Sequence, residues 1–327
     1  MKIIDPHVHL FDLQQGEYHW LKNENPPFWP QKFRIQRTYS STDLNLSDGL
    51  QLAAFVHIEA GFNNAEGHLE FAMLAEQNHK PMKAIGFIDI TLAHDEFLVA
   101  LKLQSDYAIA AGIRYIFESD VRALRNILEN ENAFNNLSFL AERNGIFELQ
   151  CDVKNTEVVV LIYAFFSRIP TLSVVINHAG FAPLPRVAGA TNDATYQLDY
   201  TNWKANMLLL SQLPKVAVKF SGFEMQQLFD SAASSAEESQ ANLHLLSNSS
   251  YPVSDLQDSL LHCLKAFGEE NVMLASNFPL CTFTHNYQQY WQQMLALLTS
   301  LPDDRLSDHN ALVYDNAKRI YGFNALS

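Results

Sequence analysis

Positive charge is scarce in this chain of 327 residues. Lysine and arginine together number 22 and aspartate and glutamate 36, which gives a formal net charge of −14 and a sequence pI near 5.2. A nucleic acid repels a chain of this charge, because its phosphates bind through basic side chains. We therefore exclude a nucleic acid as a partner and expect a small-molecule ligand.

Cysteine is equally scarce. The three cysteines are Cys151, Cys263 and Cys281, and no two of them form a Cys-x-x-Cys pair. An odd number without paired spacing predicts neither a disulfide framework nor a zinc knuckle. We expect each of them to be a small residue of the core or of a pocket wall.

Long apolar runs are absent as well. The longest, residues 158–166, has nine residues, about half of what crosses a bilayer. The chain begins Met1-Lys2-Ile3-Ile4-Asp5, with an acid where a signal peptide needs its apolar region. These features predict a cytoplasmic protein that has no membrane partner. The sequence has no internal repeat. It does not decide whether identical chains assemble, so a homo-oligomer stays possible.

Apolar residues are plentiful, at 48% against 18% charged, so the chain can bury a large core. Short runs rich in Val, Ile and Phe alternate with longer segments of helical periodicity, which indicates a β/α fold. The predicted strands are residues 2–9, 52–59, 83–89, 112–117, 146–152, 172–178, 215–221 and 272–276. The predicted helices are residues 66–79, 95–111, 132–144, 156–169, 199–212, 255–267 and 286–300.

Eight strands with intervening helices predict a (β/α)8 TIM barrel in one domain over residues 1–327, with a doubly wound open sheet as the alternative. Two connections, residues 10–48 and 224–252, are too long to be simple turns. Both follow strands, so in a barrel they lie over the C-terminal face, where active sites form. The second is either a lid or a plain Ser-rich insertion.

Histidines end two of the predicted strands. His7 and His9 lie two residues apart and therefore point to the same face of the first strand, with Asp5 below them. His178 ends the sixth strand and is followed by Ala179 and Gly180. Three such imidazoles can coordinate zinc, which keeps three protein ligands and one open position in catalytic sites. The alternative for each is a buried, hydrogen-bonded histidine.

Four strand-end segments stand out together, and Trp203, Met207 and a closing stretch, Asn316-Ala317-Lys318-Arg319-Ile320-Tyr321, accompany them. The four are Asp5-Pro6-His7-Val8-His9, Ile176-Asn177-His178-Ala179-Gly180, Val216-Ala217-Val218-Lys219-Phe220-Ser221-Gly222 and Ala275-Ser276-Asn277-Phe278-Pro279. In this combination the whole chain resembles the amidohydrolase-2 branch of the amidohydrolase superfamily, which includes relatives of pyrone-dicarboxylate lactonase and L-fuconolactonase.

The resemblance implies a distorted barrel whose pocket holds His7, His9, His178 and a residue of the eighth strand. Members of the superfamily bind one or two divalent metals at these positions, whereas the lactonase branch is thought to need none. The lysine that bridges two metals elsewhere has no counterpart in residues 112–117. We therefore expect one divalent metal such as zinc, weakly held by the three histidines, or no metal.

The chain departs from the family at the end of the eighth strand. Most members have Ser-Asp-Trp-Pro there, and the carboxylate binds metal or takes a proton from water. This chain has Asn277, and an amide cannot act as a general base. By strand position, Glu59 and Asp89 are the predicted alternative bases, although Asp89 is equally well suited to cap the following helix.

Two cations and one aromatic loop are the predicted substrate contacts. Arg114 and Lys219 lie near strand ends and favour an anionic substrate, with arginine suited to a bidentate carboxylate contact. Lys219 has the alternative of a structural pair with a barrel carboxylate. His57 shares the face of Glu59. Trp29 in the first long loop can stack on a substrate ring or pack the loop onto the barrel.

These observations predict a hydrolase of a small anionic lactone or cyclic ester, in which water attacks a carbonyl polarised by the strand-end histidines. A metal-dependent decarboxylase or hydratase of the same branch is the alternative among enzymes. A non-catalytic ligand-binding relative is the alternative outside them, because Asn277 replaces the usual aspartate. The sequence does not choose between the three.

Overall fold

The computed structural model describes residues 1–77, 80–117, 119–184, 194–225, 253–302, 306, 308–324 and 326. Eight parallel strands form one sheet in the order in which they occur in the chain. They are β1 (Lys2–Val8), β2 (Gln51–Ile58), β3 (Met82–Phe87), β4 (Ala110–Ile116), β5 (Ile146–Gln150), β6 (Ser173–Ile176), β7 (Val216–Phe220) and β8 (Val272–Leu274). A bridge between Val8 and Phe278 brings the last strand back to the first. The predicted TIM barrel is therefore confirmed, and the open doubly wound sheet is not formed.

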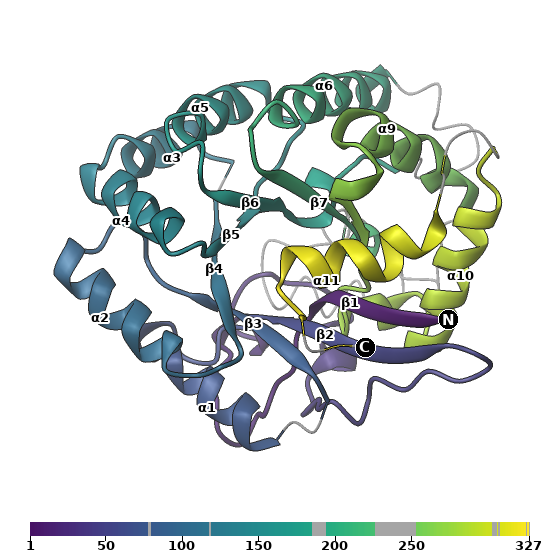
Figure 1. Cartoon of the computed structure of the whole chain (residues 1–327), viewed down its shortest axis with the longest axis horizontal. Helices are drawn as coiled ribbons and strands as arrows, with labels where there is room; N and C mark the ends of the chain where they lie inside the picture. The colour runs from purple at the N-terminus through teal and green to yellow at the C-terminus, as the bar shows by residue number, and fades with distance from the viewer. Residues whose placement is uncertain are drawn as a thin grey trace.

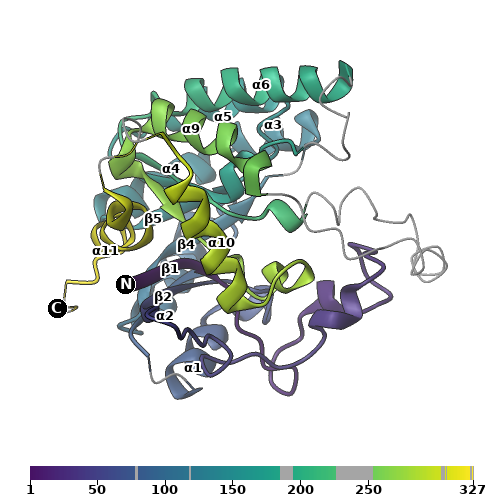
Figure 2. The same ribbon diagram turned by 90° about the vertical axis from the view of Figure 1, so that its right-hand side faces the viewer.

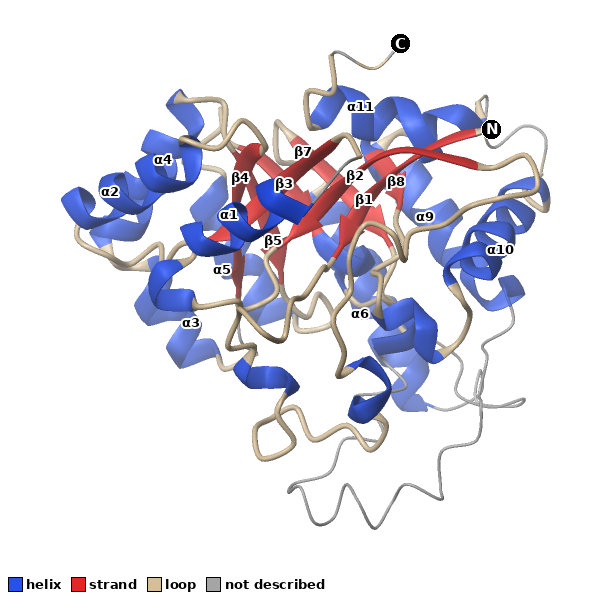
Figure 3. Cartoon of the chain, turned by 90° about the horizontal axis from the view of Figure 1, so that it is seen from below, coloured by secondary structure: helices blue, strands red, loops and turns tan. Residues whose placement is uncertain are grey.

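Helices surround the strands (Figures 1 and 3). They are α1 (His68–Gln77), α2 (His94–Ser105), α3 (Val121–Leu128), α4 (Glu131–Glu142), α5 (Thr156–Phe166), α6 (Ala194–Leu210), α9 (Gln257–Phe267), α10 (Tyr287–Thr299) and α11 (Asn316–Ile320), which follows a π-helical turn (Ala311–Asp315). Asp or Asn side chains cap the first turns of α3, α4, α5 and α10. Such caps satisfy backbone N–H groups that have no partner within the helix.

The strands are buried because helices cover them on the outside and side chains fill the barrel inside. All residues of β5, β7 and β8 are buried. Buried strands of this kind consist mostly of Val, Ile, Leu and Phe. A polar side chain in such a strand therefore needs a hydrogen-bonding or charged partner inside the barrel. Three such residues, Glu148, Gln150 and Lys219, lie in β5 and β7.

The structure differs from the predicted helices in two places. The helix predicted over residues 95–111 ends at Ser105, because residues 110–111 already belong to β4. α3 was not predicted, although Asp120 caps it with a hydrogen bond from the backbone of Ala123. Residues 78–79 of the first predicted helix, and residues 226–252 of the second long connection, lie outside the described residues.

The two ends of the barrel differ. Figure 2 shows both chain termini at one end of the barrel, and Figure 1 shows α11 lying beside β1. The connection between β1 and β2, which contains the short helical turns His19–Leu21 and Lys32–Ile35, lies at the opposite end (Figure 2). Because this connection follows β1, its end of the barrel is the C-terminal face.

In the part of the chain that the structure describes, no helix combines the length and the apolar character that crossing a membrane requires.

Candidate active site

Asp5 fixes the strand that carries the first two histidines. Its Oδ1 accepts hydrogen bonds from the backbone N–H of Ser276 at 3.1 Å and of His7 at 3.2 Å. Its Oδ2 accepts one from the Tyr287 hydroxyl at 3.0 Å. The carboxylate therefore ties β1 to the end of β8 and to α10.

The structure brings the three predicted histidines together. The Nε2 atoms of His7 and His9 are 3.2 Å apart, and the ring centroids of His7 and His178 are 4.5 Å apart. His178 has left-handed backbone angles, φ 54° and ψ 36°, in the turn Asn177–Gly180 that follows β6. All three side chains are buried, with His9 at 7% exposure the most accessible.

Gly222 leaves room for the ring of His178. A Cβ atom at position 222 would lie 2.5 Å from Nδ1 of His178, and the φ of +77° at Gly222 is one that other residues rarely adopt. The Ser-Gly pair after β7 thus places the Ser221 Oγ 3.1 Å from the same Nδ1.

The hydrogen bonds of the histidines form a directed chain. The Lys219 ammonium, 3.4 Å from Nδ1 of His7, can only donate. His7 therefore carries its proton on Nε2 and donates it to Nε2 of His9. His9 in turn donates from Nδ1 to the Ile58 carbonyl at 2.8 Å. Since Nδ1 of His178 contacts Ser221, five of the six ring nitrogens are engaged.

The three rings are neutral at neutral pH. Burial lowers the pKa of each well below its usual 6.5, because a charged imidazolium loses its hydration. The cations Lys219 and Arg114 lower the pKa values of His7 and His178 further. Neutral imidazoles act as hydrogen-bond donors and acceptors without adding charge.

Lys219 lies at the floor of the site. Its Nζ is 2.7 Å from Glu148 Oε2, and neither side chain is exposed. Glu148 also accepts hydrogen bonds from Asn177 and from the hydroxyl of Tyr321. Burial lowers the pKa of Lys219 to about 8, although Glu148 opposes that shift. This placement favours the structural alternative for Lys219, a lysine paired with a barrel carboxylate.

Sequence reasoning missed Glu148 and Gln150. A signal was present, because Glu148 and Gln150 occupy alternate positions of an otherwise apolar strand and therefore point to one face. Charge in a fully buried strand requires a buried partner, and here the partner is Lys219.

Arg114 and Glu59 form a buried ion pair at the ends of β4 and β2. The Arg114 Nη2 is 2.6 Å and its Nε 2.8 Å from Glu59 Oε1. Arg114 also donates to the Glu59 carbonyl and, from Nη1, to Gln150 Oε1. Burial raises the pKa of the Glu59 carboxyl, and the guanidinium opposes this rise. The predicted base and the predicted substrate-binding cation are thus each other's partners.

The structure engages two other predicted residues elsewhere. His57 contacts Glu70 of α1 through Nε2 at 3.1 Å and accepts a hydrogen bond from the backbone of Leu10 at Nδ1. Trp29 packs against Trp20 with ring centroids 6.1 Å apart. The indole of Trp20 donates to the Ala60 carbonyl, so this aromatic pair joins the first loop to the end of β2.

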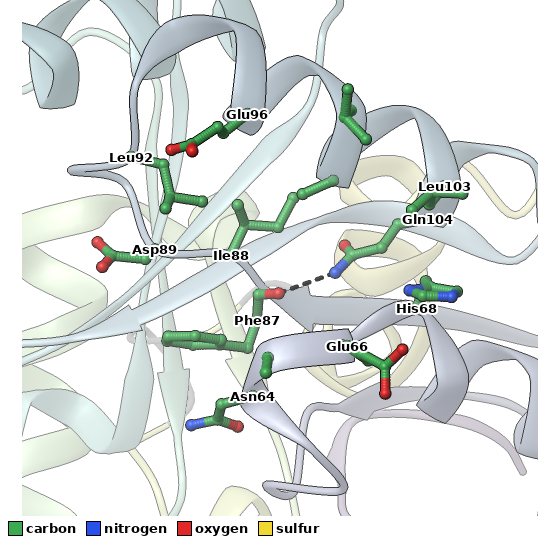
Figure 4. Close-up of a pocket in the computed structure, with 14 residues that line it drawn as sticks. Asn64, Glu66, His68, Phe87, Ile88, Asp89, Leu92, Glu96, Leu103 and Gln104 are labelled. Atoms are coloured by element: carbon green, nitrogen blue, oxygen red, sulfur yellow. Dashed lines mark hydrogen bonds between the residues drawn. The ribbon is translucent and has the colours of Figure 1, made fainter.

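Asp89 follows β3 and borders a groove of about 690 Å³ between the turn Asn64–Glu66 and α2. Figure 4 shows Asp89 at one edge of this groove and Gln104, which donates to the Phe87 carbonyl, at the other. The Asp89 Oδ1 accepts hydrogen bonds from the backbone and the hydroxyl of Thr91, both at 2.8 Å. Asp89 therefore stabilises the turn that leads to α2.

Asn277 has an acidic partner that sequence reasoning missed. Its Nδ2 donates to Oε1 of Glu224 at 2.7 Å, and both side chains are buried. Burial raises the pKa of Glu224 to about 7, while the hydrogen bond from Asn277 opposes that rise. Glu224 comes four residues after the end of β7, in the connection predicted to be a lid or an insertion, and no local pattern distinguishes it.

The distance between the His7 and His9 nitrogens suits a metal ion, but the position of the proton on His7 does not. Two nitrogen ligands of tetrahedral zinc lie about 3.3 Å apart, close to the 3.2 Å between His7 and His9. A neutral imidazole that binds metal through Nε2 must carry its proton on Nδ1, but Nδ1 of His7 faces the Lys219 ammonium.

The other positions that could supply metal ligands also argue against a metal ion. Position 277 supplies an amide whose nitrogen is bound to Glu224. Across the described residues, no group of three or more His, Cys, Asp or Glu side chains is arranged to hold a metal ion. We therefore derive no chemical step that involves a metal.

Comparison with known proteins identifies a family. A family model described as amidohydrolase matches residues 4–323. The chain is also 25% identical over 331 residues to the uncharacterized protein y4mH of Sinorhizobium fredii, with 98% of both chains covered.

Solved structures show the same fold. An amidohydrolase from Burkholderia multivorans with bound zinc has a TM-score of 0.68 and 18% identity, covering 98% of this chain and 99% of the other. A probable 2-pyrone-4,6-dicarboxylic acid hydrolase from Acinetobacter baumannii with bound citric acid has a TM-score of 0.60 and 15% identity, covering 99% of this chain and 100% of the other.

Proposed function

The chain belongs to the amidohydrolase family, and on that premise we propose that it hydrolyses a small anionic lactone or cyclic ester at the C-terminal face of its barrel. The main observation in support of this proposal is that one ring nitrogen of the histidine cluster is available to a ligand. Nε2 of His178 has no hydrogen-bond partner among the described residues, whereas the other five ring nitrogens are engaged.

His178 is the group that polarises the substrate carbonyl. If the Ser221 hydroxyl donates to Nδ1, the proton of the neutral ring is on Nε2, from which it can be donated to a carbonyl oxygen. A fixed donor in a buried site stabilises the negative charge that develops on this oxygen when water attacks, an effect worth about 10²–10³ in rate. The rings of His7 and His9 beside it are held in fixed tautomers by Lys219 and the Ile58 carbonyl.

Arg114 supplies the charge for an anionic substrate. A guanidinium has five N–H groups, and the bonds to Glu59 and Gln150 leave one N–H of Nη1 without an acceptor in the described part of the chain. An arginine is well suited to a carboxylate. The relative from Acinetobacter baumannii is consistent with this role, because it binds citric acid, a tricarboxylic acid.

The test is a panel of lactones assayed by proton release, in which each carboxylate-bearing lactone is paired with its neutral methyl ester. The panel includes 2-pyrone-4,6-dicarboxylate and lactones of sugar acids. We expect turnover of at least one anionic member, with kcat/KM about tenfold or more above that of its methyl ester, since a lost charge-assisted hydrogen bond costs roughly 1.5–3 kcal/mol.

Variants connect that turnover to the site. His178→Asn should lower kcat/KM by about 10²–10³-fold. His262→Asn is the matched control, because His262 on α9 donates to the Lys204 carbonyl away from the cluster, and it should leave the rate unchanged. Release of carbon dioxide without ring opening would favour the decarboxylase, and binding without turnover the non-catalytic relative.

A further inference from the structure

We propose that Glu224, held by Asn277, accepts the proton of the water that opens the lactone, in place of the carboxylate that most relatives carry at the end of the eighth strand. This inference rests on the proposed function and adds to it the residue that activates water. It differs from the sequence-based prediction, which assigned that role to Glu59 or Asp89.

The first argument is position. Glu224 lies two residues after Gly222, whose missing side chain makes room for the His178 ring. Asn277 immediately precedes Phe278, whose carbonyl accepts a hydrogen bond of 2.7 Å from the backbone N–H of His9. The hydrogen-bonded pair therefore spans the ends of β7 and β8, which lie between the ends of β6 and β1 that carry the three histidines.

The second argument is the unsatisfied oxygen atoms. Oε2 of Glu224 and Oδ1 of Asn277 are both buried, and neither has a hydrogen-bond partner in the described ranges. Buried acceptors are nearly always paired, and these two belong to side chains already joined at 2.7 Å. One water molecule that donates a hydrogen bond to each oxygen would satisfy both and keep its lone pairs free for attack.

The third argument is that the other carboxylates of the barrel are engaged. Glu59 binds Arg114, Glu148 binds Lys219, and Asp5 binds the end of β8. Asp89 accepts both of its hydrogen bonds from Thr91. Glu224 alone among these five combines burial with a free oxygen and no cationic partner in the described structure.

The ionisation of Glu224 suits the role. Burial raises its pKa to about 7, and a general base works best when its pKa lies near the working pH. Cys281, the titratable group that faces it from the turn Leu280–Phe283, stays neutral because burial raises the pKa of its thiol. Asp5 of β1, whose carboxylate also reaches the end of β8, contacts Ser276 and Tyr287.

The step balances as a hydrolysis. The water oxygen forms a bond to the lactone carbonyl carbon while one water proton passes to Oε2 of Glu224, and the carbonyl π electrons move to the oxygen beside His178. The tetrahedral intermediate then expels the ring oxygen, which takes the proton from Glu224. The product is one hydroxy acid, whose new carboxylic acid group ionises and releases one proton.

The experiment compares wild type, Glu224→Gln and Glu224→Asp on the best lactone of the panel, with Glu142→Gln, at the exposed end of α4, as the matched control. We expect Glu224→Gln to lower kcat by about 10²–10⁴-fold with KM nearly unchanged, and to lose the acidic limb of the pH–rate profile. Glu224→Asp should recover part of the rate, and Glu142→Gln should behave as wild type.

Infrared difference spectroscopy gives a second readout that needs no turnover. Wild type should show a protonated-carboxyl band that disappears with a midpoint near pH 7, and Glu224→Gln should lack it. An active wild type beside an equally active Glu224→Gln overturns the inference and leaves the proposed function standing. A wild type that turns over no lactone refutes the proposed function and with it the hydrolytic step, and the absence of the band would also refute Glu224 as a buried proton acceptor.

Discussion

In the proposed mechanism, Asn277 and Glu224 share the role that the resemblance assigns to one aspartate at the end of the eighth strand. The amide donates a hydrogen bond of 2.7 Å to Glu224 Oε1, and the carboxylate supplies the ionisable group. Both side chains are buried, and burial favours the protonated form of Glu224. The exchange therefore changes the ionisation of the site as well as the position of the base.

This arrangement makes Asn277→Asp a diagnostic substitution. Two carboxylates at hydrogen-bond distance share one proton, so the pKa of one of them rises. We expect the acidic limb of the pH–rate profile to move up by at least about one pH unit and the rate at pH 7 to fall by about tenfold. Asn126→Asp, on the exposed side of α3, is the control. A rate that rises instead would show that Asn277 marks lost catalysis.

Glu224 also predicts a pH dependence of stability. Its folded pKa of about 7 lies above the ordinary 4.5, so its contribution to stability is complete below pH 4.5 and is lost as the pH rises through 7. Glutamine cannot ionise and avoids that loss. Glu224→Gln should therefore gain about 3 kcal/mol of unfolding free energy relative to wild type between pH 4.5 and pH 8.

Urea unfolding of wild type and Glu224→Gln at both pH values measures this difference. A difference that stays constant with pH would show that Glu224 ionises normally in the folded protein, which would contradict the effect of its burial. A stabilised but inactive variant would fit the common cost of a functional site to stability.

The turn that follows β7 helps to position His178, although this histidine itself lies in the turn after β6. Gly222→Ala places a methyl group 2.5 Å from Nδ1 of His178, so we expect the ring to move and kcat/KM to fall by at least about 10²-fold. Gly49→Ala is matched to it, since Gly49 also has a positive φ, +84°, but nothing within 4 Å of the added Cβ.

Both alanine variants should lose about 1 kcal/mol or more of unfolding free energy because both adopt a left-handed backbone. Gly222→Ala alone should lose activity. Equal activity of the two variants, measured on the same lactone, would mean that the position of the His178 ring does not matter for the reaction.

The strands and their ends were predictable from the sequence because each strand is a short, buried apolar run between turn residues. β1, β5 and β7 were predicted to within two residues of their observed bounds. Since the ends of parallel strands meet at one face, the strand assignment also predicted that His7, His9 and His178 would meet. The helix predicted over residues 95–111 extended too far, because periodicity alone does not show where β4 begins.

The partners of the polar residues were not predictable in the same way. The ion pair of Glu59 and Arg114 joins residues 55 positions apart, and nothing near either residue in the sequence distinguishes a partner from a substrate contact. Glu224 illustrates the same limit, because its burial and its contact with Asn277 arise only from the packing of the folded chain. Strand order places residues at a face, but packing decides which of them remain available to a ligand.

The whole barrel limits what the histidines can bind, because their surroundings come from β1, β6 and β7 together. Lys219 of β7 donates to His7 of β1, which opposes the tautomer that a metal needs. We expect the dialysed protein to retain less than one equivalent of zinc and to keep its lactonase rate in a chelator. Two tightly held equivalents, measured by elemental analysis, would contradict this arrangement.

The most direct test of a water-using hydrolase is the source of the oxygen in the product. Wild-type protein is incubated in H₂¹⁸O with the anionic lactone that it turns over fastest, and the product is analysed by mass spectrometry. Hydrolysis at the carbonyl predicts a ring-opened hydroxy acid with one ¹⁸O in its new carboxyl group and no loss of carbon dioxide. A product without ¹⁸O, loss of carbon dioxide, or an unchanged lactone would contradict the proposed function.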